Sequence, residues 1–319
     1  MAVYVNTNYS ALQGQRYLGN VQNQLTTTYQ RLSSGMRINS AKDDAAGLQI
    51  ADRLTSQING LNQGNRNASD GIALAQTMEA GMDEISGMLQ KVRTLAVQAN
   101  NGTNTAEDRR SIGKEMEALV NEVNRIAQKT TFAGKTILNG KITGSIYGDT
   151  AAGGAPNNGP AGVTGTLTLQ VGSNKGDTIS FTADSVMFSK IGTGNLMGTT
   201  ADKVFKTSAD GSIIVTLTKA ATDTTATSIS AIVDLMDSMI SKVDGMRADL
   251  GALQNRLESS IRNQSNVAAN EADARSRIRD ADFAEESANL SQQSIIQQAA
   301  ASMLMQANTR PQLGLSLLG

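Results

Sequence analysis

The sequence predicts a mainly α-helical protein, in which both chain ends form an elongated helical bundle or coiled-coil rod around a variable β-rich insert. Apolar residues keep alternating three- and four-residue spacing over residues 41–99, 105–126 and 229–257, which is the pattern of packed helices. Between residues 129 and 228 the pattern changes to period two, and fifteen of the 30 glycines lie there. Aromatic residues make up 3% of the 319 residues, too few for an ordinary globular core.

The two chain ends carry thin apolar stripes at helical spacing. The N-terminal stripe contains Leu18, Val21, Leu25 and Leu32, and the C-terminal stripe contains Ile296 and Met303. Because much of each turn is small or polar, neither helix has a wide enough apolar face to be stable alone. We expect both helices to stay frayed until something covers them.

The central stripes predict longer helices. A helix over residues 41–99 would be roughly 90 Å long at the standard rise. Thr105 and Asp108 have the spacing of a capping box and predict the start of a second helix. The third stripe, over residues 229–257, contains no polar member. Such stripes need partners, so the two halves of the chain are expected to pack side by side.

Short alternating runs in the middle of the chain predict β-hairpins. They are "GTLTLQVG", "DTISFTAD" and "GSIIVTLTKA", bounded by Gly, Asn and Asp, while "DTAAGGAPNNGPAG" reads as a loop.

Two charged clusters were considered as sites. Asp43 and Asp44 could bind a hard cation, but Ser40 and Asp43 form a helix-start pattern, so we interpret the carboxylates as capping groups near a helix N-terminus. In the segment from 270 to 286, Glu271 with Arg275 and Asp273 with Arg277 have the spacing of i,i+4 ion pairs. Lys91 and Arg93 are expected to be solvated.

Composition excludes several functions. The 28 basic and 29 acidic residues are balanced without a basic run, so nucleic acid is a poor partner. Histidine and cysteine are absent, which removes the commonest general base, the usual transition-metal ligands and the thiol nucleophile. We therefore predict no enzyme activity and no cofactor. No secretory signal or membrane-spanning run is recognisable, so we expect no cleaved signal peptide and no membrane insertion.

At both ends the chain resembles bacterial flagellins. The resemblance is carried by "LSSGMRINSAKDDAAGLQIADRL", "LQKVRTLAVQANNGTN", "TFAGKTILNG", "ALQNRLESSIRNQSN", "ARSRIRDADFAEE" and the ending "LSLLG", which lie within residues 1–140 and 229–319. It implies a structural subunit that polymerises into the extracellular flagellar filament used for swimming. It also implies an inner coiled-coil domain (1–40 and 280–319), a rod domain (41–140 and 229–279) and an outer domain (141–228). The stripe residues of the chain ends would make the polymer contacts of the inner domain: Leu18, Val21, Leu25, Leu32, Ile296 and Met303. The segment with Ser40, Asp43 and Asp44 would be the spoke between the inner and rod domains, beside Arg275 and Arg277.

The resemblance also implies partners. These are other copies of the chain, filament-cap and hook-junction proteins, the flagellar type III export apparatus and its chaperone. The chaperone would contact the apolar residues Ile295, Leu304, Leu317 and Leu318. A host Toll-like receptor that senses flagellins would contact Lys91, Leu95 and Glu115. Recognised family members carry arginine at the position of Lys91, and lysine does not replace arginine's bidentate fork.

Other functions remain open at this point. A hook-filament junction protein shares helical ends with flagellins, although the "INSAKDDAAGLQIADR" and "LSLLG" matches favour flagellin. The insert could act as an adhesin or carry O-linked glycans on its many Ser and Thr residues. A filament-borne zinc protease is excluded because its H-E-x-x-H motif requires histidine, and a carboxylate-only hydrolase has little support.

Overall fold

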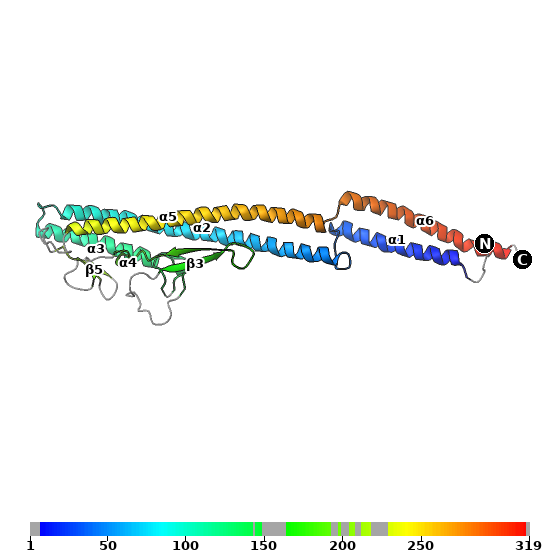
Figure 1. Cartoon of the computed structure of the whole chain (residues 1–319), viewed down its shortest axis with the longest axis horizontal. Coiled ribbons are helices and arrows are strands. Elements are labelled where there is room, and N and C mark those ends of the chain that lie inside the picture. Colours follow the sequence, from blue (N-terminus) through cyan, green and yellow to red (C-terminus); the bar gives the residue numbers. More distant parts are fainter. Residues whose placement is uncertain are drawn as a thin grey trace. The chain divides into compact units, whose positions relative to one another are not determined.

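The computed structural model describes residues 7–142, 144–148, 164–192, 197–198, 204–207, 212–217 and 229–316. Its contacts divide the chain into two compact units. The terminal unit comprises Met1–Asn59 and Asn266–Gly319, and the central unit comprises Gly60–Ser265. The predicted fold class is confirmed: along the sequence the strands lie between long helices from the two chain ends, and in the central unit they lie along one side of the helices (Figure 1).

The central unit is built on α3 (Ala106–Lys129), on residues 60–99 of α2 (Ala45–Ala99) and on residues 229–265 of α5 (Ile229–Arg279). Polar contacts between α2 and α5 show that they run antiparallel: Gln254 donates to Glu79 at 3.0 Å, and Arg93 Nε pairs with Asp237 at 2.6 Å. The predicted stripes supply the core, including the fully buried Met82, Ile85, Leu89, Met116, Met236, Met239 and Val243. Partner helices therefore cover the apolar faces as expected.

Helix α3 begins where the sequence predicts. Thr105 accepts from the Asp108 backbone N–H, while the Asp108 carboxylate accepts from the Thr105 hydroxyl and backbone N–H at 2.7 and 2.9 Å. These bonds from Thr105 lower the pKa of Asp108. The predicted capping box is confirmed.

The strands follow α3. The first pair is β1 (Thr131–Phe132) with β2 (Lys135–Thr136), and the second is the antiparallel hairpin β3 (Gly165–Gln170) with β4 (Thr178–Ala183). A short helix α4 (Phe188–Ile191) precedes a three-stranded sheet of β5 (Met197–Gly198), β6 (Phe205–Thr207) and β7 (Ile213–Val215). Predicted hairpin runs thus supply β3, β4 and β7, while the loop at 149–162 lies outside the described residues.

Close backbone contact holds the β3–β4 hairpin on α2. Asn67 Nδ2 donates to the Gln170 carbonyl oxygen at 2.9 Å, and Gly64 leaves room for the Val171 carbonyl. Beside the hairpin, the buried Tyr147 hydroxyl donates to the Ile137 carbonyl at 2.8 Å, and burial raises the pKa of Tyr147. Strand-bearing segments therefore share one core with the helices.

The terminal unit contains α1 (Tyr9–Ser34) and α6 (Phe283–Ser316), which lie side by side (Figure 1). Frayed ends were expected from the thin stripes, whereas the structure has both segments as continuous helices. The reason is that each helix covers part of the apolar stripe of the other, which is the condition the sequence set for order.

Candidate functional site

The contact between α1 and α6 uses most of the predicted stripe residues. Val21 is 4% exposed, and Leu18, Leu25, Leu32 and Ile296 are half-buried. Leu304 packs against α1 beside Gly14, where a Cβ would lie 3.2 Å from Leu304 Cδ1. Met303, in contrast, is 70% exposed, at the edge of this contact, where it lines a hollow with Gly14 and Tyr17 of α1.

Polar contacts set the register of the two helices. Arg31 Nη1 pairs with the buried Glu286 carboxylate at 3.1 Å, Thr28 donates to Gln293 at 3.2 Å, and Asn8 donates to the Ala307 carbonyl at 2.8 Å. Sequence reasoning missed all three, because the partners lie more than 250 residues apart along the chain and no periodicity links them.

The segment after α1 pairs with the segment between α5 and α6. Gly35 ends α1 in the left-handed conformation with φ 69°, which glycine adopts without steric cost. The Arg279 carbonyl then accepts from the Arg37 and Ile38 backbone N–H groups at 2.7 and 3.3 Å, and Ala281 N–H donates to the Gly35 carbonyl at 3.0 Å. The two halves of the chain therefore meet at this point, as the sequence suggests.

Helix α2 starts later than predicted. Its first residue is Ala45, and Asp44, rather than Ser40, occupies the capping position by accepting from Gly47 N–H at 2.9 Å. Asp43 instead closes the preceding turn by accepting from the Ser40 and Asn39 backbone N–H groups at 2.9 and 3.1 Å. The prediction that Ser40 caps the helix is therefore wrong. Ser40 and Asp43 close a turn that ends one residue before the capping residue, Asp44.

The charge of Asp43 should make this turn pH-dependent. The Ser40 and Asn39 N–H bonds lower the pKa of Asp43, so its ionised form contributes stability above its unfolded pKa of about 3.9 and loses it as the pH falls through the folded pKa. Asp43→Asn should lower the melting temperature at neutral pH, and this difference should vanish in acid. Thermal unfolding from about pH 7 to about pH 2 checks it; a difference independent of pH would contradict it.

The two arginines expected beside this turn, Arg275 and Arg277, have partners other than Asp43 and Asp44. Arg275 Nη1 donates to Thr55 Oγ1 at 3.3 Å, and Arg277 pairs with Asp273 at 2.8 Å, which confirms the latter i,i+4 pair. Among the described residues the expected ion pair of Glu271 with Arg275 does not form, and one buried Glu271 oxygen has no hydrogen-bond partner. The positive charge of Arg31 on α1, rather than that of these arginines, helps to lower the pKa of Asp43.

The two terminal helices leave large apolar side chains uncovered. Eight of them on α1 and α6 are more than half exposed: Tyr9, Leu12, Tyr17, Tyr29, Phe283, Ile295, Met303 and Met305. We call these eight residues the terminal apolar set. Four of the five tyrosines of this aromatic-poor chain fall within its first 29 residues, a signal that could have indicated such a surface. Apolar exposure of this density is typical of an interaction surface.

Residues proposed for other partners are placed as follows. Lys91 and Glu115 are exposed on α2 and α3, and Leu95 is half-buried against the core. Arg93 is not simply solvated, because its guanidinium makes two bonds to Asp237 that lower the pKa of that carboxyl. Ile295 is 66% exposed, whereas Leu304 faces α1. Leu317 and Leu318 lie outside the described residues.

Comparison with known proteins identifies the family. The family model of the bacterial flagellin N-terminal helical region matches residues 5–143, and that of the C-terminal helical region matches residues 233–318. Flagellin B of Vibrio cholerae is 37% identical over the whole of both chains. The chain belongs to the bacterial flagellin family. Polar flagellin C of Vibrio parahaemolyticus is 34% identical, again over the whole of both chains.

A solved structure shares the flagellin's fold. It is a Vibrio parahaemolyticus protein described as a flagellar hook-associated protein, 15% identical, with a TM-score of 0.54 over 75% of this chain and 100% of that one. The flagellin is thus a structural subunit of the extracellular flagellar filament, used for motility. None of its described helices is long and apolar enough to span a membrane.

Proposed function

We propose that the terminal unit makes the contacts that polymerise the filament. The observation that carries this proposal is the terminal apolar set, which α1 and α6 leave uncovered in the single chain. Equivalent helices of neighbouring subunits would cover these side chains and form an inner coiled-coil domain. Because the same surface is repeated on each copy without closing on itself, growth would continue as a helical filament.

The proposed subunit has three layers. Residues 1–40 and 280–319 form the inner domain, residues 41–140 and 229–279 the rod domain, and residues 141–228 an outer domain. Leu18, Val21, Leu25, Leu32 and Ile296 would hold the inner helix pair together, while Met303 would point to a neighbour. The role is structural, without catalysis or cofactor.

Truncation tests the assignment of polymerisation to the terminal unit. Removal of residues 1–33 or of residues 285–319 should leave the central unit folded, because its core lies within residues 60–265, but should prevent filament growth. Sulfate-induced assembly followed by electron microscopy measures this, and circular dichroism reports the remaining helix. Normal filaments from either truncation would refute the proposal.

Export is proposed to proceed through the flagellar type III apparatus without a cleaved signal peptide. A chaperone would bind the apolar side of α6 and the tail, at Ile295, Leu304, Leu317 and Leu318, and would delay assembly before export. The exposure of Ile295 supports this placement. Leu304 is half-buried beside Gly14, so it would be reached in full only when α6 separates from α1. Filament-cap and hook-junction proteins complete the proposed partners.

Recognition by a host Toll-like receptor is proposed to use Lys91, Leu95 and Glu115. Lys91→Arg should increase signalling, because arginine presents a planar donor pair that lysine lacks. A cell reporter assay with both proteins at equal concentration checks this, with Arg93 left unchanged because it is paired with Asp237. Equal signalling by the two proteins would mean that the lysine at position 91 does not weaken recognition by the receptor.

A further inference from the structure

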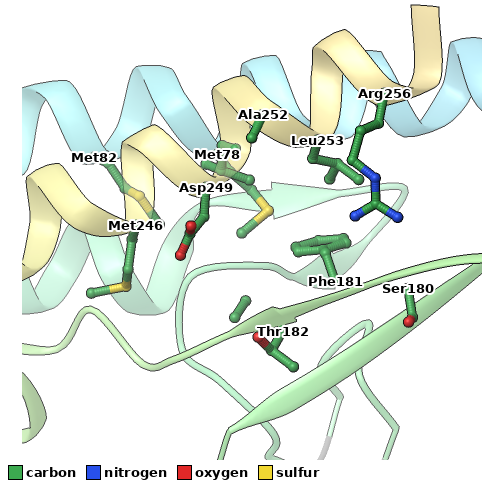
Figure 2. A pocket seen from close by; sticks show the side chains of 12 residues that line it. Met78, Met82, Ser180, Phe181, Thr182, Met246, Asp249, Ala252, Leu253 and Arg256 are labelled. Atoms are coloured by element: carbon green, nitrogen blue, oxygen red, sulfur yellow. The ribbon is translucent and has the colours of Figure 1, made fainter. Parts of the chain in front are cut away.

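A cavity of about 310 Å³ lies between the strand β4 and the helix α5 in the central unit (Figure 2). Its apolar floor is formed by Met78, Met82, Met246, Leu250 and Leu253, with Phe181 beside them. Its volume is at the lower end of the range for small-molecule sites. Three methionines give the floor an adaptable surface that can fit side chains of different shape.

The cavity is bordered by the open edge of β4. Four consecutive residues line it, from Ser180 to Ala183. Since successive side chains point to opposite faces of a strand, a cavity that touches four in a row borders the strand's edge. β4 pairs with β3 on its other side, and among the described residues no second strand pairs with it. Backbone N–H and C=O groups of alternate residues are therefore available to an added strand.

Charges of opposite sign stand at the two ends of the cavity. Asp249 and Arg256 both project from α5 toward β4 (Figure 2), and neither makes an ion pair with the residues that the structure describes. Seven residues of helix separate them by about 10 Å. Three residues of extended chain span the same length, about 10 Å.

The direction of β4 decides which end of a peptide meets which charge. Near the start of β4, Ile179 pairs with Leu169, which lies beside Leu257 of α5. Beyond the end of β4, the Ile191 carbonyl accepts from Lys242, which comes earlier in α5. β4 therefore runs opposite to α5. A strand added antiparallel to β4 runs with α5, so its amino end lies near Asp249 and its carboxyl end near Arg256. A parallel strand would place like charges together at both ends.

We propose that this slot binds a short free peptide, about three residues long, as an additional strand antiparallel to β4. Its terminal ammonium group would pair with Asp249, its terminal carboxylate with Arg256, and an apolar side chain would lie on the methionine floor. This binding site is independent of the polymerisation surface, because all its residues belong to the central unit.

Methionine methyl NMR of the full-length monomer tests the proposal, with the tripeptide Ala-Leu-Ala as the probe. The ¹³C-methyl signals of Met78, Met82 and Met246 should shift together and saturate. Those of Met116 and Met236, which are fully buried and do not line the cavity, should not move. No shift up to about 10 mM peptide would overturn the proposal.

Matched ligands and variants test the orientation. Asp249→Asn or Arg256→Gln should each weaken binding about threefold to fivefold, the range expected for one exposed charge pair. A peptide with acetylated and amidated ends loses both pairs and should bind about tenfold to twentyfold more weakly. N-methylation of the leucine amide should weaken binding further, because it blocks strand pairing. Equal affinity for the blocked peptide would overturn the proposal, as would methyl shifts that follow protein concentration without peptide, which would mean that a second copy fills the slot.

Discussion

Replacing Gly64 by alanine is expected to destabilise the central unit, whereas the same replacement at Gly87 of the same helix is expected to stabilise it. A Cβ at Gly64 would overlap the backbone carbonyl of Val171, which cannot move without lifting the β3–β4 hairpin from α2. Overpacking of this kind costs about 1–3 kcal/mol. At Gly87 a Cβ would meet nothing within 4 Å, so the helix gains about 0.5–1 kcal/mol from the better helix former.

Urea unfolding followed by circular dichroism measures both variants under one condition. Amide hydrogen exchange locates the change, since faster exchange in residues 165–170 and 178–183 would show that the hairpin has loosened. If Gly64→Ala were as stable as Gly87→Ala, the close approach of hairpin and helix would not exist in solution.

Glu286→Ala is expected to loosen the helix pair of the terminal unit. Glu286 is 7% exposed, and its removal leaves the Arg31 guanidinium, whose Nε already lacks a partner, without its counter-ion. Removing one partner of a fully buried pair costs about 3–5 kcal/mol. Because a third of Arg31 is exposed to water, the expected loss is smaller, about 1–3 kcal/mol.

Hydrogen exchange in the second half of α1 measures this loss directly and should accelerate about fivefold or more. Asp273→Ala is the matched control in the same unit, because its partner Arg277 is 79% exposed and such pairs contribute about 0–1 kcal/mol. Equal protection of α1 in wild type and Glu286→Ala would mean that apolar contacts alone hold the pair. A loosened pair should also polymerise more slowly, which ties this contact to the proposed assembly.

The helices could be predicted from the sequence because their apolar periodicity is long and uninterrupted. The stripe over residues 229–257 and the Thr105–Asp108 capping box gave α5 and α3 their positions. The start of α2 was misplaced because Ser40 and Asp43 have the spacing of a capping pattern, and only the structure shows that Asp43 closes a turn while Asp44 caps the helix. Local patterns constrain such boundaries to within a few residues.

By itself the sequence determined the mainly helical fold, the position of the strands and the resemblance to flagellins, because each depends on spacing along the chain. Only the tertiary structure decided which charges pair, as Arg31 does with Glu286, and which apolar side chains stay exposed, as Met303 does while Leu304 is covered. The physical reason is that pairing and burial depend on where distant segments meet. A periodic stripe indicates that a face needs a partner, but it does not identify the residues of that partner.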